Sequence, residues 1–208
     1  MLNKLDATLQ GVCPTVMVPR HEALMPLAES GHRFLAARDG LYAEVKRPWL
    51  RSTFRVAESA VPLPYGEVIP ATHFSIDRRQ LAESLDRFIE EARQAFPKEH
   101  AAWLSFMDGE GLRYEPVRVE SSGGGHIRYR RPTVAGGRVL AIDIHSHGRH
   151  DAFWSVTDDR DDKDDAKLAI VFGNLDAPQP SVKARLLALG AAMDFSELVD
   201  SIWNTQTT

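Results

Sequence analysis

The sequence has a single cysteine, Cys13, so the chain cannot form an internal disulfide. No motif places a His or Asp beside this thiol, and a half-buried structural cysteine is a simpler interpretation than a nucleophile. No apolar run reaches the roughly 18 residues of a membrane-spanning helix, and the first residues lack the apolar core of a signal peptide. A formal net charge of −4 argues against nucleic acid as the main partner. We therefore expect a cytoplasmic protein without a disulfide framework.

Hydrophobic residues make up 43% of the 208 residues and charged residues 26%, which is typical of an ordinary globular protein. A chain of this length forms one large domain, or one domain with a small companion. A proline-rich stretch at residues 61–72 indicates a connection, and the clearest helical pattern follows it. We therefore expect an N-terminal region of residues 1–70 and a main domain of residues 71–208.

The N-terminal region is predicted to be rich in β-structure. The Asp-Gly pair at residues 39–40 lies between two apolar stretches and indicates a β-hairpin. Residues 12–19 alternate in polarity but contain two prolines, which is typical of an edge strand. A short helix is expected at residues 21–31 and a further strand at residues 49–56.

Residues 76–96 show the strongest helical pattern of the chain, with Ser75 as the expected N-cap and Pro97 as the stop. Its apolar residues recur at spacings of three and four, which predicts one buried face. These residues are Leu81, Leu85, Phe88, Ile89, Ala92 and Phe96.

A series of strands is expected after this helix. Residues 101–107 indicate a buried strand, and residues 112–119 its hairpin partner. Residues 126–132 alternate and predict a strand whose arginines form an exposed face or meet an acidic partner; these are Arg128, Arg130 and Arg131. Residues 167–173 indicate another buried strand. The periodicity of residues 182–193 fits either a helix or a strand, and residues 195–203 indicate a C-terminal helix.

Two histidines follow a short apolar run at residues 139–144, which indicates a buried strand. His145 and His147 are two residues apart, so their side chains point to the same face and can reach one point. Ser155 and Asp158 follow at a spacing of three, which places both on one face of a helix's first turns. Two imidazoles and one carboxylate form a ligand set that Zn²⁺ accepts while a fourth position stays open to water.

Each of these residues has an ordinary structural interpretation. A His-x-His pair at a strand end is often a polar rim, and Asp158 begins a run of six aspartates that is typical of a solvated helix start. The remaining members are Asp159, Asp161, Asp162, Asp164 and Asp165. Taken together, in the context of a strand, a helix and a second strand, the four motif residues favour a metal site.

The order H-x-H-x7-S-x-x-D resembles the signature of the JAMM (JAB1/MPN/Mov34) metalloproteases at every motif position. One departure is Gly148, where many members have proline, and this affects loop rigidity more than chemistry. The resemblance implies a mixed α+β fold in which a curved mixed β-sheet is flanked by helices. It also places the late strands of the fold at residues 182–193, which favours strand there.

The JAMM family also uses a glutamate from the start of its first core strand, after the first helix. In the order of the elements Glu99, in the segment FPKEHAAW, corresponds to that residue and would act as a general base. A plain surface glutamate after a helix is the simpler alternative. Four other glutamates compete for the role: Glu67, Glu110, Glu115 and Glu120.

The function that the resemblance implies is that of a zinc-dependent peptidase or isopeptidase acting at the C-terminal tail of a ubiquitin-like protein. His145, His147 and Asp158 would hold the zinc, Glu99 would move the proton, and the Ser155 hydroxyl would stabilise the oxyanion. Similarity to the JAB-domain components of the bacterial PRTRC gene cassettes adds a ThiF-like activating enzyme as a partner. Two alternatives remain: a non-catalytic MPN-type binding scaffold, and another metal-dependent hydrolase such as a phosphoesterase.

Overall fold

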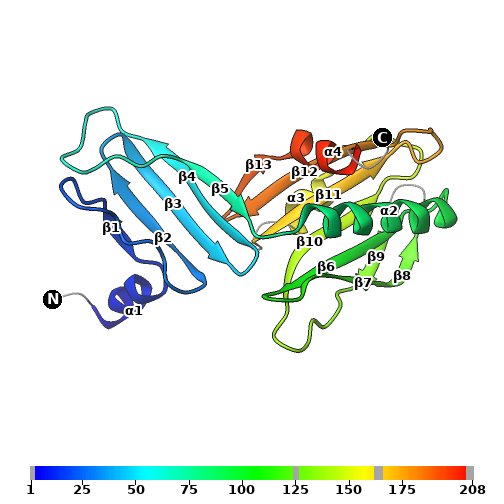
Figure 1. Ribbon diagram of the computed structural model, residues 1–208, viewed down its shortest axis with the longest axis horizontal. Helices are drawn as coiled ribbons and strands as arrows, with labels where there is room; N and C mark the ends of the chain where they lie inside the picture. The colour runs from blue at the N-terminus through cyan, green and yellow to red at the C-terminus, as the bar shows by residue number, and fades with distance from the viewer. Residues whose placement is uncertain (1–2, 124–126, 162–165, 205–208) are drawn as a thin grey trace. The chain divides into compact units, whose positions relative to one another are not determined.

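The computed structural model describes residues 3–123, 127–161 and 166–204 of the chain. Its internal contacts divide it into two compact units, residues 1–75 and 76–208, which run from blue to cyan and from green to red in Figure 1. None of the helices among the described residues is both long and apolar enough to cross a membrane.

The N-terminal unit is a five-stranded sheet with one short helix (Figure 1). The strands stand in the order β1-β2-β3-β4-β5, and every neighbouring pair is antiparallel except β1 and β2. This confirms the β-rich N-terminal region. Its elements are α1 (Lys4–Val12), β1 (Thr15–Met17), β2 (Gly31–Ala37), β3 (Gly40–Arg47), β4 (Leu50–Glu58) and β5 (Ala71–Phe74).

The predicted hairpin joins β2 to β3 through the two residues 38–39, with Ala37 paired to Gly40. A Cβ atom at Gly40 would lie 2.1 Å from the carbonyl oxygen of Ala57, so only glycine lets β4 approach here. The apolar faces of the strands enclose a small core of Val18, Leu35, Ala37 and Tyr42.

The helix predicted at residues 21–31 is wrong, because residues 21–30 have no regular structure and Gly31 begins β2. Pro26 lies in its middle and cannot donate a helical hydrogen bond. Side chains from β2 and β3 bind its backbone instead. Arg33 donates to the carbonyl of Met25 at 2.5 Å, and the Glu44 carboxylate accepts from the amide of Leu27 at 3.3 Å. Arg33 and Glu44 also form a buried ion pair at 2.6 Å.

The second unit is built on a six-stranded sheet in the order β13-β12-β11-β10-β6-β7, with a separate two-stranded sheet of β8 and β9. The only parallel neighbours among these described strands are β10 and β11. The strands are β6 (Ala101–Met107), β7 (Gly111–Pro116), β8 (Arg118–Ser122), β9 (Ile127–Arg130), β10 (Val139–Ser146), β11 (Lys167–Gly173), β12 (Ser181–Ala188) and β13 (Ala191–Asp194).

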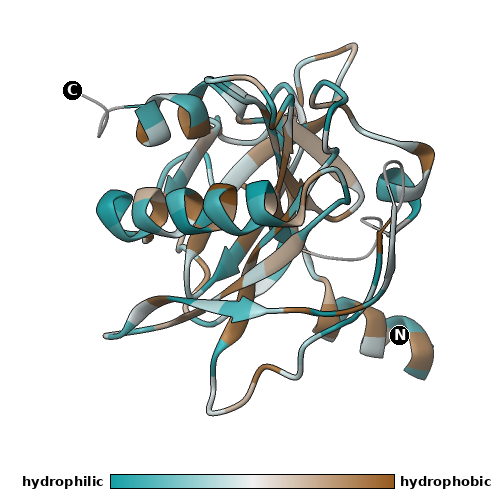
Figure 2. Cartoon of the chain, turned by 90° about the vertical axis from the view of Figure 1, so that its right-hand side faces the viewer, coloured by the Kyte–Doolittle hydropathy of each residue, from teal (hydrophilic) through white to brown (hydrophobic). Residues whose placement is uncertain are grey.

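Two helices, α2 (Arg78–Ala95) and α4 (Ser196–Asn204), contact each other and the sheet. The ring of Phe172 on β11 lies 5.8 Å from Phe88 of α2 and 5.2 Å from Trp203 of α4. Figure 2 shows the hydrophilic side of α2 turned outward. Five of the six residues predicted for its apolar face are buried; Phe96 follows the end of the helix.

The structure corrects two predicted boundaries. The side chain of Asp77 accepts a hydrogen bond from the amide of Gln80 at 2.9 Å, so Asp77, and not Ser75, is the N-cap of α2. Residues 112–119 are not one strand, because β7 ends at Pro116 and β8 then pairs with β9. Residues 182–193 form the predicted β-structure, folded as the hairpin of β12 and β13.

The two faces of the sheet differ in chemistry because side chains alternate along β10. Ile142 and Ile144 are fully buried, and Ile144 pairs in register with Ile170 of β11 on the side that carries Phe172. Asp143 and His145 therefore point to the opposite face. The predicted mixed α+β class is confirmed: one face of the mixed sheet packs against α2 and α4, and the other carries Asp143 and His145.

Candidate metal centre

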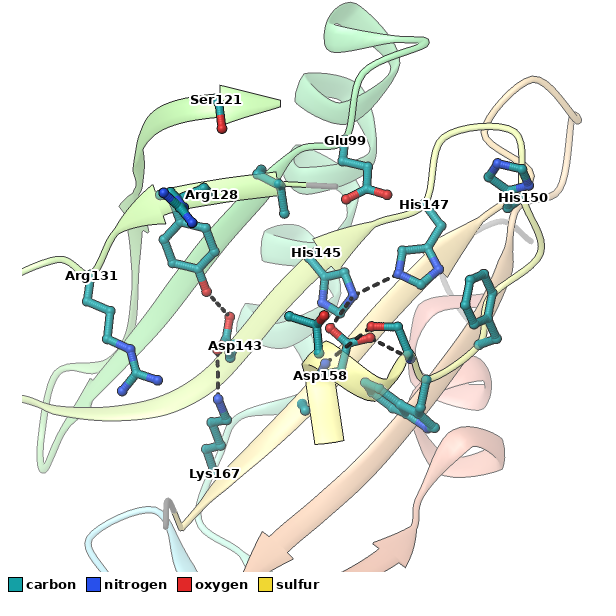
Figure 3. Close-up of a pocket in the computed structure, with 17 residues that line it drawn as sticks. Glu99, Ser121, Arg128, Arg131, Asp143, His145, His147, His150, Asp158 and Lys167 are labelled. Atoms are coloured by element: carbon teal, nitrogen blue, oxygen red, sulfur yellow. Dashed lines mark hydrogen bonds and ion pairs between the residues drawn. The ribbon is translucent and has the colours of Figure 1, made fainter. Parts of the chain in front are cut away.

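His145 and His147 meet at the end of β10. Their Nε2 atoms lie 3.1 Å apart (Figure 3). His147 lies just beyond the strand, but its amide donates to the carbonyl of Phe172 at 2.8 Å and so extends the pairing of β10 with β11. The parallel neighbour strand thus holds both imidazoles on one side of the sheet.

The loop after His147 is fixed by backbone hydrogen bonds. The amide of His150 donates to the carbonyl of His147 at 3.0 Å, and the amide of Leu175 donates to the carbonyl of Gly148 at 2.9 Å. Gly148 has a φ of 56°, which proline cannot adopt and other L-residues adopt at a cost. The departure from the family pattern at this position therefore matches the backbone conformation of this chain.

Ser155 and Asp158 lie at the start of α3 (Val156–Asp161). The amide of Ser155 donates to Asp158 Oδ2 at 2.7 Å, and the amide of Asp158 donates to Ser155 Oγ at 3.2 Å. This reciprocal pair is the hydrogen-bond pattern of a helix start and fixes the Asp158 carboxylate. The other oxygen, Oδ1, lies 3.4 Å from His145 Nε2.

The geometry of His145, His147 and Asp158 fits a zinc ion. One ligand atom from each lies within 4.8 Å of the others. Zinc–ligand bonds of about 2.0–2.1 Å in a tetrahedron put ligand atoms about 3.3 Å apart. Two of the three separations here, from His145 to His147 and from His145 to Asp158, are 3.1 and 3.4 Å. Among the residues that the structure describes, this is the one group of histidine, cysteine and carboxylate side chains with the geometry of a metal site.

The electrostatics of the cluster suit metal ligation. Burial, and then the neighbouring His145, lower the pKa of His147 to about 4, so its imidazole is neutral at neutral pH. Burial alone would raise the pKa of Asp158, but His145 and the hydrogen bonds from Ser155 hold it below its ordinary value. The centre therefore presents the neutral imidazole of His147 and the ionised carboxylate of Asp158, the forms that bind a metal.

Glu99 lies just before β6 and lines the same cavity as the cluster (Figure 3). It is only 6% exposed, and burial followed by the charge of Asp158 raises its pKa to about 7. The competing glutamates have partners elsewhere. Arg138 binds Glu110, Ser105 and Arg113 bind Glu115, Arg130 lies near Glu120, and Arg38 binds Glu67.

The other aspartates of the run at residues 158–165 lie either outside the cluster of His145, His147 and Asp158 or outside the described part of the chain. Asp159 forms an ion pair with Arg185 at 2.7 Å and is not part of the cluster. Asp162, Asp164 and Asp165, and the side chain of Asp161, lie outside the described residues. Of the two aspartates of the run whose side chains are described, Asp158, at the motif spacing, is the one beside the histidines.

The cavity around the cluster has a volume of about 810 Å³ and contains residues that the sequence did not single out. The ring of Phe153 lies 4.3 Å from that of His147, and the ring of Trp154 lies 6.4 Å from that of His145. On the cavity floor Lys167 pairs with Asp143 at 2.8 Å. One signal was visible in the sequence, since Asp143 interrupts an apolar strand and shares its face with His145.

Comparison with known proteins assigns both parts of the chain. Residues 3–75 match the family model of a domain of unknown function, DUF2016. No curated protein matches the chain. Among solved structures, the solution structure of protein DSY2949 from Desulfitobacterium hafniense is 20% identical, with a TM-score of 0.41, over 54% of this chain and 85% of that one. Residues 81–187, more than half of the chain, match the family model of prokaryotic homologs of the JAB domain, and the chain therefore belongs to that family.

Proposed function

We propose that this chain is a zinc-dependent metallopeptidase or isopeptidase of JAMM type, which hydrolyses a peptide or isopeptide bond at the C-terminal tail of a ubiquitin-like protein. One observation carries the proposal: three ligand atoms converge at the end of β10, and a buried glutamate with a raised pKa lines the same cavity. A metal site alone would suit a scaffold, whereas a buried proton acceptor beside it suits hydrolysis.

Zinc bound to this cluster would acidify a water molecule and polarise the scissile carbonyl. Glu99 takes a proton from the attacking water at a carboxylate oxygen, as a pKa near neutrality allows. The water oxygen bonds to the carbonyl carbon, the carbon–nitrogen bond breaks, and Glu99 returns the proton to the leaving amine.

Ser155 has two tasks in this scheme. Its Oγ accepts the amide hydrogen of Asp158, which orients the carboxylate ligand. A hydroxyl that accepts one hydrogen bond can still donate another, and Ser155 lines the cavity. It therefore donates to the oxyanion that develops on the substrate carbonyl.

The proposed substrate and partners follow from the resemblance to PRTRC system protein A, carried by the segments FPKEHAAW, AIDIHSHG and AFWSVTDDRDDKDDAKLAIVFGN. Such cassettes encode a ubiquitin-like protein, the proposed substrate, and a ThiF-like activating enzyme, the proposed partner. A ubiquitin-like tail is flexible, and addition to a sheet edge would order it in the cavity.

The test is incubation of the zinc-loaded full chain with the ubiquitin-like protein of a PRTRC cassette, followed by intact-mass spectrometry. We expect loss of a C-terminal extension, and no loss with Glu99→Gln. An unchanged mass in the presence of bound zinc would favour the non-catalytic scaffold.

A further inference from the structure

The cavity extends beyond the metal cluster toward β9. Ile127, Arg128 and Tyr129 of β9 line it together with Arg131, and Asp143 and Lys167 also line it. In Figure 3 His147 and His150 lie on one side of this space, and Arg128 and Arg131 lie on the Asp143 side. The described mechanism uses only the first side, so the second is free to bind substrate.

Most charges on the Asp143 side are already balanced. Lys167 is 2% exposed and binds Asp143 Oδ2 at 2.8 Å. The hydroxyl of Tyr129 donates to Asp143 Oδ1 at 3.1 Å, so both carboxylate oxygens are occupied. Each oxygen of Asp143 thus already accepts one hydrogen bond from within the protein, and Lys167 already balances the charge of the carboxylate.

Arg128 is an exposed guanidinium beside this balanced floor. Within the described ranges we find no ion pair for it, whereas Arg130, two residues along the same strand, lies 3.8 Å from Glu120. A guanidinium offers a planar pair of donors that suits a carboxylate. Arg128 thus has the chemistry of a carboxylate-binding group and is among the residues that line the cavity.

The position of Arg128 sets the register of that carboxylate. Asp143 precedes His145 by two residues on β10, which is about 6.6 Å along a strand, and Tyr129 reaches down to Asp143 from β9. Arg128 precedes Tyr129 on β9, so a substrate that extends from the cluster past Asp143 would meet Arg128 after about two residues.

We propose that Arg128 is a specificity-determining residue that binds a substrate carboxylate about two residues from the cleaved bond. The carboxylate is either an acidic side chain or a free C-terminus. This inference rests on the proposed peptidase function and adds to it the class of sequence that the cavity selects.

The probes are fluorescein-labelled octapeptides with a central Gly-Gly bond and an amidated C-terminus. They carry glutamate, glutamine or lysine two residues before or after that bond. A further set of labelled hexapeptides is not amidated and ends in a free carboxylate two residues after the same bond. Binding to the zinc-loaded full chain is measured by fluorescence anisotropy, and cleavage in the same samples by mass spectrometry. The two sources of carboxylate are distinguished by comparing the glutamate and free-carboxylate sets.

We expect the wild type to bind a carboxylate-bearing peptide about fivefold more tightly than the glutamine peptide, the size of a solvent-accessible arginine–carboxylate contact. Arg128→Gln should remove this preference and Arg128→Glu should turn it toward lysine. Both variants should keep wild-type zinc content. Arg130→Gln is the matched control and should keep the preference, because Arg130 does not line the cavity.

Equal affinities of the wild type for the glutamate, glutamine and free-carboxylate sets would overturn the proposal. So would a preference that survives Arg128→Gln, or the absence of measurable binding. Cleavage without a charge preference would remove the role of Arg128 and leave the peptidase function standing. An Arg128-dependent preference without cleavage would support the subsite and count against the peptidase.

Discussion

At the scale of single residues, Glu99 and His147 depart from their ordinary protonation in opposite directions. Burial favours the neutral form of each, which raises the pKa of Glu99 to about 7 and lowers that of His147 to about 4. The neutral imidazole is ready to bind a metal, and the carboxyl group can exchange a proton near neutral pH. Burial thus prepares both groups for their roles.

Replacement of Glu99 by glutamine should keep the bound zinc and reduce turnover by a factor of roughly 10²–10⁴, the usual contribution of a general base. The amide keeps the shape of the side chain but cannot accept the proton. Zinc content by elemental analysis and initial rates on the tail substrate measure the two effects. Glu120→Gln is the control, since Glu120 lies outside the cavity, and near-normal activity of Glu99→Gln would assign the base to another group.

The raised pKa of Glu99 also predicts how the stability of the metal-free protein depends on pH. Between its ordinary value of 4.5 and about 7 the folded state binds more protons than the unfolded state, so stability falls as pH rises. His147 acts in the opposite sense, because its pKa is lowered from 6.5 to about 4 and its contribution is lost as pH falls through that range.

Glu99→Gln removes the first effect. In the presence of a chelator, we expect the free energy of unfolding of this variant at pH 8 to exceed that of the wild type by on the order of 2 kcal/mol. This figure allows for solvent that reaches the cavity. The difference should shrink toward pH 4.5. Urea unfolding at both pH values measures it, and a difference that does not change with pH would show that Glu99 ionises freely.

At the scale of elements, the loop after β10 decides whether the histidines stay together. Gly148 has a left-handed backbone, and a Cβ atom there would lie 2.9 Å from the carbonyl oxygen of Pro97. Gly148→Ala should therefore cost about 1–2 kcal/mol from the backbone alone and weaken zinc binding by displacing His147.

Gly109→Ala is the matched control for this loop. Gly109 also has a positive φ, of 80°, but its Cβ would meet no atom within 4 Å. Thermal unfolding should show a loss of stability in both variants, and zinc titration should show weaker binding in Gly148→Ala alone. Equal zinc affinity of the two variants would mean that the loop does not position His147.

The elements that the sequence predicted well are those whose pattern reflects one buried surface. The strands at residues 101–107 and 167–173 were predicted at their observed bounds because their apolar runs end at turn residues. Helix α1 was missed because none of its residues is buried, so no core-facing pattern marks it. The segment at 21–31 misled because long-range hydrogen bonds from Arg33 and Glu44 determine its course.

Some residues of the site can be predicted from local sequence spacing, and others depend on long-range packing. The motif spacing identifies His145, His147 and Asp158 because each is fixed by its own strand or helix start. The identification of Glu99 required the order of the helices and strands in addition to the segment FPKEHAAW around it. Arg128 and Phe153 reach the cavity through tertiary packing, which no local spacing reveals.

At the scale of the whole molecule, the contacts separate residues 1–75 from residues 76–208. Strand β5 pairs with β4 and so belongs with the N-terminal sheet. That the chain divides near residue 70 into parts that fold independently stays a prediction. All the residues of the cluster lie in the second unit. We expect the N-terminal unit to serve docking or autoinhibition and not metal binding.

A chain of residues 76–208 should fold and bind zinc with the affinity of the full chain, because its sheet and covering helices are complete. Circular dichroism and zinc titration of this chain test the point. Aggregation of residues 76–208, together with a single cooperative transition of the full chain, would show that the two units fold as one.

The central claim is that His145, His147 and Asp158 form a zinc site, and its most direct test is the zinc content of the purified, metal-replete chain. We predict about one zinc ion per wild-type chain and loss of that zinc in Asp158→Asn. Asp159→Asn, the neighbouring residue that pairs with Arg185, should retain it. A wild-type chain without zinc, or equal zinc content in the two variants, would contradict the account.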